Sequence, residues 1–144
     1  MVLAFDREFL NRIRCTPVEI KELCTSIRIL ISFAEKAKKG GLFVIEAELE
    51  NVDLGNLHLN RFFKKCFELV FDGIDAKNTY FILRNRILLN AYSGKELLHR
   101  ILIAEGALGI QAGNSPRLIR EKLISYLPDS FWDSQESISC SELL

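Results

Sequence analysis

The sequence of 144 residues has no long apolar run, no excess charge of one sign and no Cys-x-x-Cys motif. Without roughly 18 or more consecutive apolar residues, no transmembrane helix is expected. The 19 basic and 19 acidic residues cancel, which argues against a nucleic-acid partner because phosphate binding needs a net basic domain or face. The four cysteines are irregularly spaced, and residues 6–8 are charged where a secretion signal would be apolar, so a reduced cytoplasmic protein is expected.

Residues that could carry catalysis or bind a metal are sparse. His58 and His99 have no second ligand at metal-binding spacing, so both are expected to be surface or capping histidines. The segment Ser93–Glu96 lacks the upstream glycine and the final Ser or Thr of a phosphate loop. Helix capping explains Asp72 and Asp75 better than acid–base catalysis does. We therefore expect no enzyme, no cofactor and no metal, and only a deep pocket holding Asp72, Asp75 or His99 would favour an active site.

Apolar residues recur at helical spacing along most of the chain, and no stretch alternates as a strand would. This pattern predicts an all-α fold, a compact bundle of five or six helices formed by residues 1–128 as one domain. The serine-rich, acidic stretch 129–144 is expected to be a flexible tail. After a short amphipathic opening segment, the expected helices run from Thr16 to Gly40-Gly41, from Leu42 to Glu50, through Leu59–Val70, through Tyr80–Leu88, through Leu97–Leu108, and from Pro116 to Pro128.

Local signals mark helix starts and contacts. Thr16-Pro17-Val18-Glu19 predicts a capping box with proline at the first helical position. Gly106 and Gly109 each cost roughly 1 kcal/mol against alanine inside a helix, so a close helix crossing is expected there. We expect the helix that starts at Thr16 to pair antiparallel with the helix around Ile101 as the central seam. The pattern leaves open whether Ser93-Gly94 lies in one long helix or in a hairpin.

A charged cluster spans the Gly40-Gly41 break. Lysines close the long helix, where cations favour the negative end of the helix dipole. Two glutamates follow one helical turn apart, and like charges at that spacing repel by about 0.2–0.5 kcal/mol. A solvated face tolerates that cost, and a face that meets a charged partner would show it too. The candidate partner-binding residues are Lys36, Lys38, Lys39, Glu46 and Glu50.

Two stretches resemble a known family. Phe33–Glu50, which reads FAEKAKKGGLFVIEAELE, and Ile103–Pro128 are similar to the cytoplasmic parts of the flagellar stator subunit MotA, a relative of the TolQ and ExbB proton-channel proteins. Phe67–Ile87 is similar to a lesser degree. The family has a pair of membrane-spanning helices between that segment and the last one, and here only a short polar and mixed segment stands there. The resemblance implies a MotA-like cytoplasmic domain that lacks the transmembrane helices and does not conduct ions.

The same resemblance implies a partner. In MotA a basic residue before this glycine and an acidic residue after it contact the rotor protein FliG, and Lys38 and Glu46 stand at those positions. We expect a soluble, motility-related protein that binds FliG or a stator-associated scaffold in the cytoplasm, at the inner face of the membrane near the flagellar motor. The alternative is a self-assembling helical scaffold, a homo-oligomer that kept the fold without the motor role.

Overall fold

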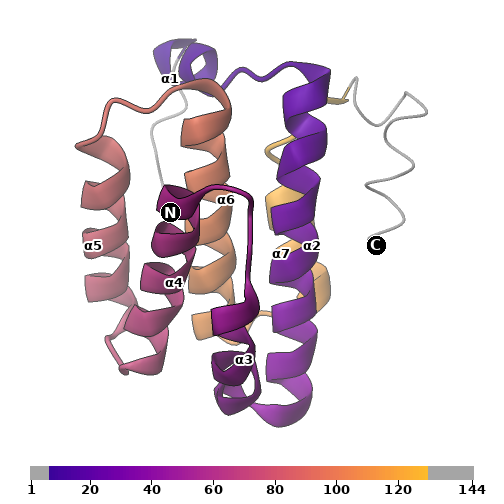
Figure 1. Cartoon of the computed structure of the whole chain (residues 1–144), viewed down its shortest axis with the longest axis vertical. Helices are drawn as coiled ribbons and strands as arrows, with labels where there is room; N and C mark the ends of the chain where they lie inside the picture. The colour runs from indigo at the N-terminus through magenta and orange to yellow at the C-terminus, as the bar shows by residue number, and fades with distance from the viewer. Residues whose placement is uncertain (1–6, 130–144) are drawn as a thin grey trace.

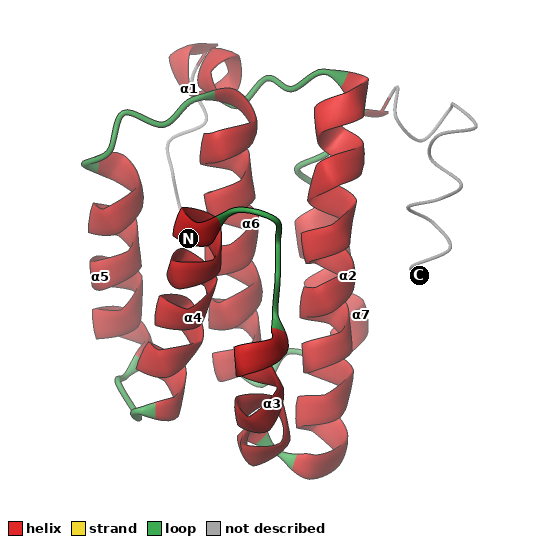
Figure 2. Cartoon of the chain, viewed as in Figure 1, coloured by secondary structure: helices red, strands yellow, loops and turns green. Residues whose placement is uncertain are grey.

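The computed structural model describes residues 7–129, where every regular element is a helix (Figures 1 and 2). The predicted all-α fold is confirmed: the six expected helices correspond to α2–α7, and the opening segment to α1. The predicted tail beyond residue 129 lies outside the described residues. The elements are α1 (Arg7–Arg12), α2 (Pro17–Gly40), α3 (Leu42–Glu48), the short 3-10 helix η1 (Leu49–Asn51), α4 (Leu57–Phe71), α5 (Ala76–Leu88), α6 (Gly94–Gln111) and α7 (Pro116–Ile124).

The helix boundaries follow from local chemistry. The Thr16 hydroxyl accepts from the Glu19 amide at 3.2 Å and the Glu19 carboxylate accepts from the Thr16 amide at 2.9 Å, so the predicted capping box is present. Asp75 caps α5 as predicted, because its carboxylate accepts from the Asn78 amide at 2.8 Å. Gly41 ends α2 with a φ of 79°, a backbone conformation that glycine adopts without steric cost.

The central seam joins α2 to α6, but these helices run parallel, and the antiparallel prediction was wrong. Lys95 near the start of α6 bonds Glu22 near the start of α2 at 2.6 Å. Further along both helices, Gly106 lies against Leu30. The residues in contact therefore advance in the same direction along both helices, as Figure 1 shows.

A non-helical return explains the parallel seam. Residues 52–56 run back beside α2 as an extended loop (Figure 2), held where the Leu54 amide donates to the Asn60 side chain at 2.7 Å. The helix that follows, α4, therefore runs in the same direction as α2. Helix α5 runs in the opposite direction, and α6 again runs parallel to α2. Residues 89–93 connect α5 to α6, so the Ser93-Gly94 junction forms a hairpin rather than one long helix.

Close packing at two glycines supports the core. A Cβ atom on Gly106 would lie 2.7 Å from the Leu30 side chain, and one on Gly109 would lie 3.1 Å from Ile119. The close crossing predicted at these glycines is thus confirmed. Within residues 7–129, no helix combines the length and the apolar character that crossing a bilayer requires.

Candidate protein-interaction surface

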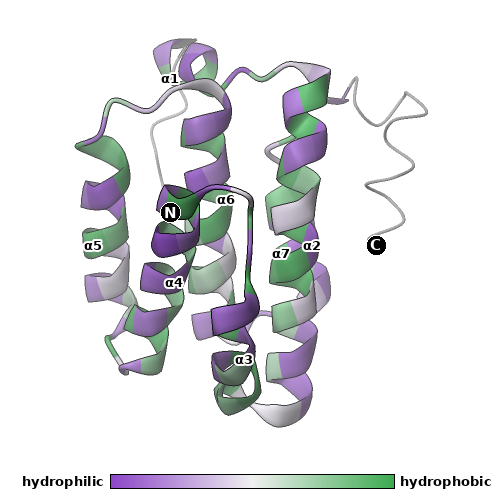
Figure 3. Cartoon of the chain, viewed as in Figure 1, coloured by the Kyte–Doolittle hydropathy of each residue, from purple (hydrophilic) through white to green (hydrophobic). Residues whose placement is uncertain are grey.

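The end of α2 and the whole of α3 form an elbow around Gly41 at one end of the bundle (Figure 1). Ile45 and Leu49 are buried and hold α3 against the core. The first turn of α3 is apolar but uncovered: Phe43 is 82% exposed, and Leu42 and Val44 are also exposed. Figure 3 shows this hydrophobic stretch on the ribbon of α3. Three consecutive exposed apolar side chains at a helix bend are a candidate contact for another molecule.

Two of the five predicted charges are used inside the molecule. The Lys36 ammonium bonds the Glu48 carboxylate at 2.6 Å, which ties α2 to α3. Glu50 pairs with Lys64 at 2.8 Å, which ties η1 to α4. These contacts give both residues a structural role, since they hold the elbow against the bundle.

The predicted spacing of Glu46 and Glu50 on one helix was wrong. The α-helix ends at Glu48, and Glu50 lies in η1. Leu49 is 4% exposed and turns into the core, and the chain tightens into a 3-10 turn there, as helix ends often do. The two carboxylates therefore do not stack one helical turn apart.

The three remaining charges are solvent-exposed. Lys38, Lys39 and Glu46 form no ion pair with residues 7–129. Glu46 follows Phe43 by three positions in α3, a spacing that places both side chains on one helix face. We define the elbow surface as Lys38, Lys39, Phe43 and Glu46. It combines exposed charges of both signs with one exposed aromatic side chain.

A hollow of about 360 Å³ adjoins the elbow surface. Its walls are the last turns of α2, the start of α3 and the turn between α6 and α7. Lys38 stands beside small and apolar side chains there, an arrangement suited to an apolar group next to a carboxylate. The lining residues are Ala34, Ala37, Lys38, Gly41, Leu42, Ile110, Gln111, Gly113, Asn114 and Ser115.

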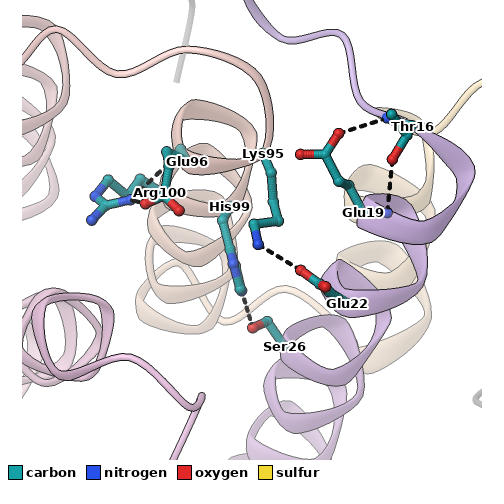
Figure 4. Close-up of polar contacts among 8 residues, drawn as sticks. All are labelled: Thr16, Glu19, Glu22, Ser26, Lys95, Glu96, His99 and Arg100. Atoms are coloured by element: carbon teal, nitrogen blue, oxygen red, sulfur yellow. Dashed lines mark hydrogen bonds and ion pairs between the residues drawn. The ribbon is translucent and has the colours of Figure 1, made fainter.

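His99 lies in a different hollow, of about 410 Å³, between α2, α6 and the return loop. Its side chain is 6% exposed, so the surface or capping role predicted for it was wrong. The imidazole Nε2 atom is hydrogen-bonded to the Ser26 hydroxyl across the seam (Figure 4). Burial, and then the charge of Arg100, lower the pKa of His99 to about 4. Helical periodicity does not indicate this burial, because a histidine fits either face of an amphipathic helix.

Several polar side chains around this second hollow are already bonded to one another. Ser26 has no exposed surface, and its hydroxyl is already hydrogen-bonded to the His99 imidazole. Glu22 pairs with Lys95 at 2.6 Å (Figure 4), and the Glu96 carboxylate pairs with Arg100 at 2.9 Å. No group of three His, Cys, Asp or Glu side chains within residues 7–129 could hold a metal ion.

Of the three residues named for the catalytic alternative, Asp72 and Asp75 do not line this hollow, and His99 does. Asp72 ends α4 and Asp75 begins α5, and both are exposed. Hydrogen bonds from the Asn78 amide and side chain lower the pKa of Asp75, as expected for a capping carboxylate. The structure therefore separates Asp72 and Asp75 from His99.

The chain matches no protein-family model, no curated protein and no solved structure.

Proposed function

We propose that this chain is a MotA-like, flagellar motor-associated protein that binds FliG or a stator-associated scaffold through the elbow surface and conducts no ions. One observation supports this proposal most directly. Internal ion pairs use Lys36 and Glu50, while Lys38 and Glu46, the positions that resemble the contact residues of MotA, stay unpaired among residues 7–129.

The arrangement suits reversible binding. Charges of opposite sign orient a partner with a complementary pattern and speed its association. Phe43, which is 82% exposed and lies three positions before Glu46, supplies the apolar anchor that interface energetics usually require. Contact would then remove an exposed aromatic side chain from water without removing any ion pair that holds the fold.

The direct test is the affinity of the full chain for purified FliG, with wild type beside the double variant K38E/E46K. This exchange preserves net charge while inverting the charge pattern, so affinity should fall tenfold or more. The matched control is K65E/E68K, which exchanges a pair on α4 that the structure places 3.7 Å apart. Unchanged affinity in K38E/E46K, or an equal loss in the control, would contradict the proposal.

A capture experiment separates the two partner classes and the self-assembly alternative. Tagged wild type and K38E/E46K are recovered from native cells, and bound proteins are identified by mass spectrometry. Motor components recovered by wild type alone support the elbow surface. Recovery of the chain alone, with a mass that rises with concentration in light scattering, would favour the self-assembling scaffold instead.

A further inference from the structure

Helix α5 carries an outward stripe that the elbow surface does not involve. Lys77, Phe81, Arg84 and Leu88 follow one another at steps of four, three and four residues, which places them on one helix face. All four are exposed, with Phe81 at 59% and Leu88 at 37%, and Leu89 just beyond the helix is 83% exposed. The stripe therefore alternates cationic and large apolar side chains along one edge of the bundle.

The local charge is positive although the chain is neutral overall. Within Ala76–Leu88 there are three cations and no acidic residue. None of these cations, Lys77, Arg84 and Arg86, forms an ion pair with residues 7–129. Asp75, which caps the helix, offsets part of the charge of Lys77. The positive character is thus strongest toward the end that carries Leu88.

The charges on α4 and on the turn before α5 do not cancel this pattern. On α4, which packs beside α5, Glu68 is already paired with Lys65. Asp72 lies in the turn before α5, at the end of the helix away from Leu88. An approaching anionic surface therefore meets the arginine half of α5 first.

The exposed side chains of this face favour one kind of anionic partner over another. Four hollows of about 350–570 Å³ among residues 7–129 are lined by residues of other elements, and α5 lies at the edge of the bundle (Figure 1). Protein partners draw most affinity from side chains that fill pockets. A lipid surface needs no pocket, because protruding apolar side chains enter it while cations remain among the headgroups.

We propose that α5 is a docking face for an anionic lipid bilayer, with Phe81, Leu88 and Leu89 entering the interface and Lys77 and Arg84 contacting lipid phosphates. A neutral chain has little long-range attraction to such a membrane, so binding would depend on this local patch. The end of α5 that carries Leu88 lies away from α3 (Figure 1). Membrane docking and partner binding at the elbow surface therefore use separate parts of the molecule.

The test is co-sedimentation of the full chain with vesicles at low ionic strength. Vesicles of equal parts phosphatidylglycerol and phosphatidylcholine should bind it, and pure phosphatidylcholine should not. Each cation near an anionic surface strengthens binding, so K77E/R84E should weaken partition by about 30-fold or more. F81S/L89S should also weaken binding while leaving the remaining binding salt-dependent.

The control is K38E/K39E, which makes the same change in net charge on the elbow surface. It should partition like wild type, and circular dichroism should confirm that every variant is folded. Absence of binding to the anionic vesicles would overturn the proposal, and so would an equal loss in K38E/K39E. Vesicle binding and FliG affinity are measured in separate experiments. Failure of the membrane proposal would therefore not decide the FliG proposal.

Discussion

The Ser26 hydroxyl and the His99 imidazole are hydrogen-bonded in the seam between α2 and α6. Ser26 has no exposed surface and His99 has 6%. A protonated imidazole would place a charge in this buried site, which is costly without a paired anion. The native state therefore holds His99 neutral, and its pKa is lowered from 6.5 to about 4.

Acid should destabilise the protein through His99 at a milder pH than through its carboxylates. Between pH 6.5 and 4 the unfolded chain binds a proton at this residue that the folded chain excludes, so stability falls as pH falls. The expected loss between pH 7 and pH 5 is about 2 kcal/mol. Urea denaturation of wild type and His99→Gln measures it, since glutamine can still bond Ser26 but does not titrate.

The carboxylates whose pKa is lowered affect stability over a lower pH range than His99 does. Glu19 and Asp75 have ordinary values of 4.5 and 3.8, so their contribution is lost mainly below pH 5. The variant His58→Gln, at an exposed position on α4, is the matched control and should keep the wild-type pH dependence. Equal pH dependence in wild type and His99→Gln would contradict the buried neutral imidazole.

Gly106→Ala should destabilise the protein even though alanine favours helices. A Cβ atom at this position would lie 2.7 Å from the fully buried Leu30 side chain. Overpacking in a core typically costs about 1–3 kcal/mol, which exceeds the helix gain of about 1 kcal/mol. Thermal denaturation measures the balance.

The matched variant Gly109→Ala should cost less, because its nearest contact is 3.1 Å from Ile119. Combining Gly106→Ala with Leu30→Ala provides a direct check, because the smaller side chain makes room and the two effects should not add. A Gly106→Ala variant that is more stable than wild type would show that Leu30 can move aside.

Thr16→Ala should lower stability by about 1 kcal/mol, the usual cost of losing a helix N-cap. The hydroxyl accepts from the Glu19 amide at 3.2 Å, and alanine leaves that amide without its partner. Chemical denaturation provides the measurement. Val18→Ala, two residues away at a 68% exposed position, is the control and should change stability little.

Local features of this fold could be predicted from the sequence, and relations between distant segments could not. Two of these features, the caps at Thr16 and Asp75, depend on chemistry within a few residues. The third, the close approach at Gly106, depends on the absence of a side chain there. The direction of α6 against α2 depends on residues 52–56 returning without a helix. Such a loop has no periodicity that indicates its path.

The candidate surface also combines local features that the sequence predicts with tertiary contacts that it does not. Exposure of Lys38 and Glu46 follows from their place at a glycine break, and the sequence indicated it. The internal role of Glu50 depends on Lys64 lying 2.8 Å away in another helix, a distance set by tertiary packing. For the same reason, helical periodicity alone could not reveal the burial of His99 against Ser26.

Phe43 and Ile45 are two positions apart in α3 and should respond oppositely to substitution. Ile45 has no exposed surface, so Ile45→Ala should cost about 2–5 kcal/mol of stability. Phe43 is 82% exposed, so Phe43→Ser should leave the unfolding free energy nearly unchanged. If the elbow surface binds FliG, Phe43→Ser should nevertheless weaken that affinity tenfold or more, because the aromatic anchor is lost.

Two measurements on the same variant make this contrast decisive. Urea denaturation reports the stability of Phe43→Ser, and titration with purified FliG reports its affinity. Lost affinity with intact stability assigns Phe43 to an interface. Intact affinity would mean that only the charged residues of the elbow surface contact FliG. Lost stability would mean that Phe43 packs within the fold instead of facing a partner. Leu118→Ser, at a 44% exposed position on α7, controls for removal of an exposed apolar side chain and should change neither quantity.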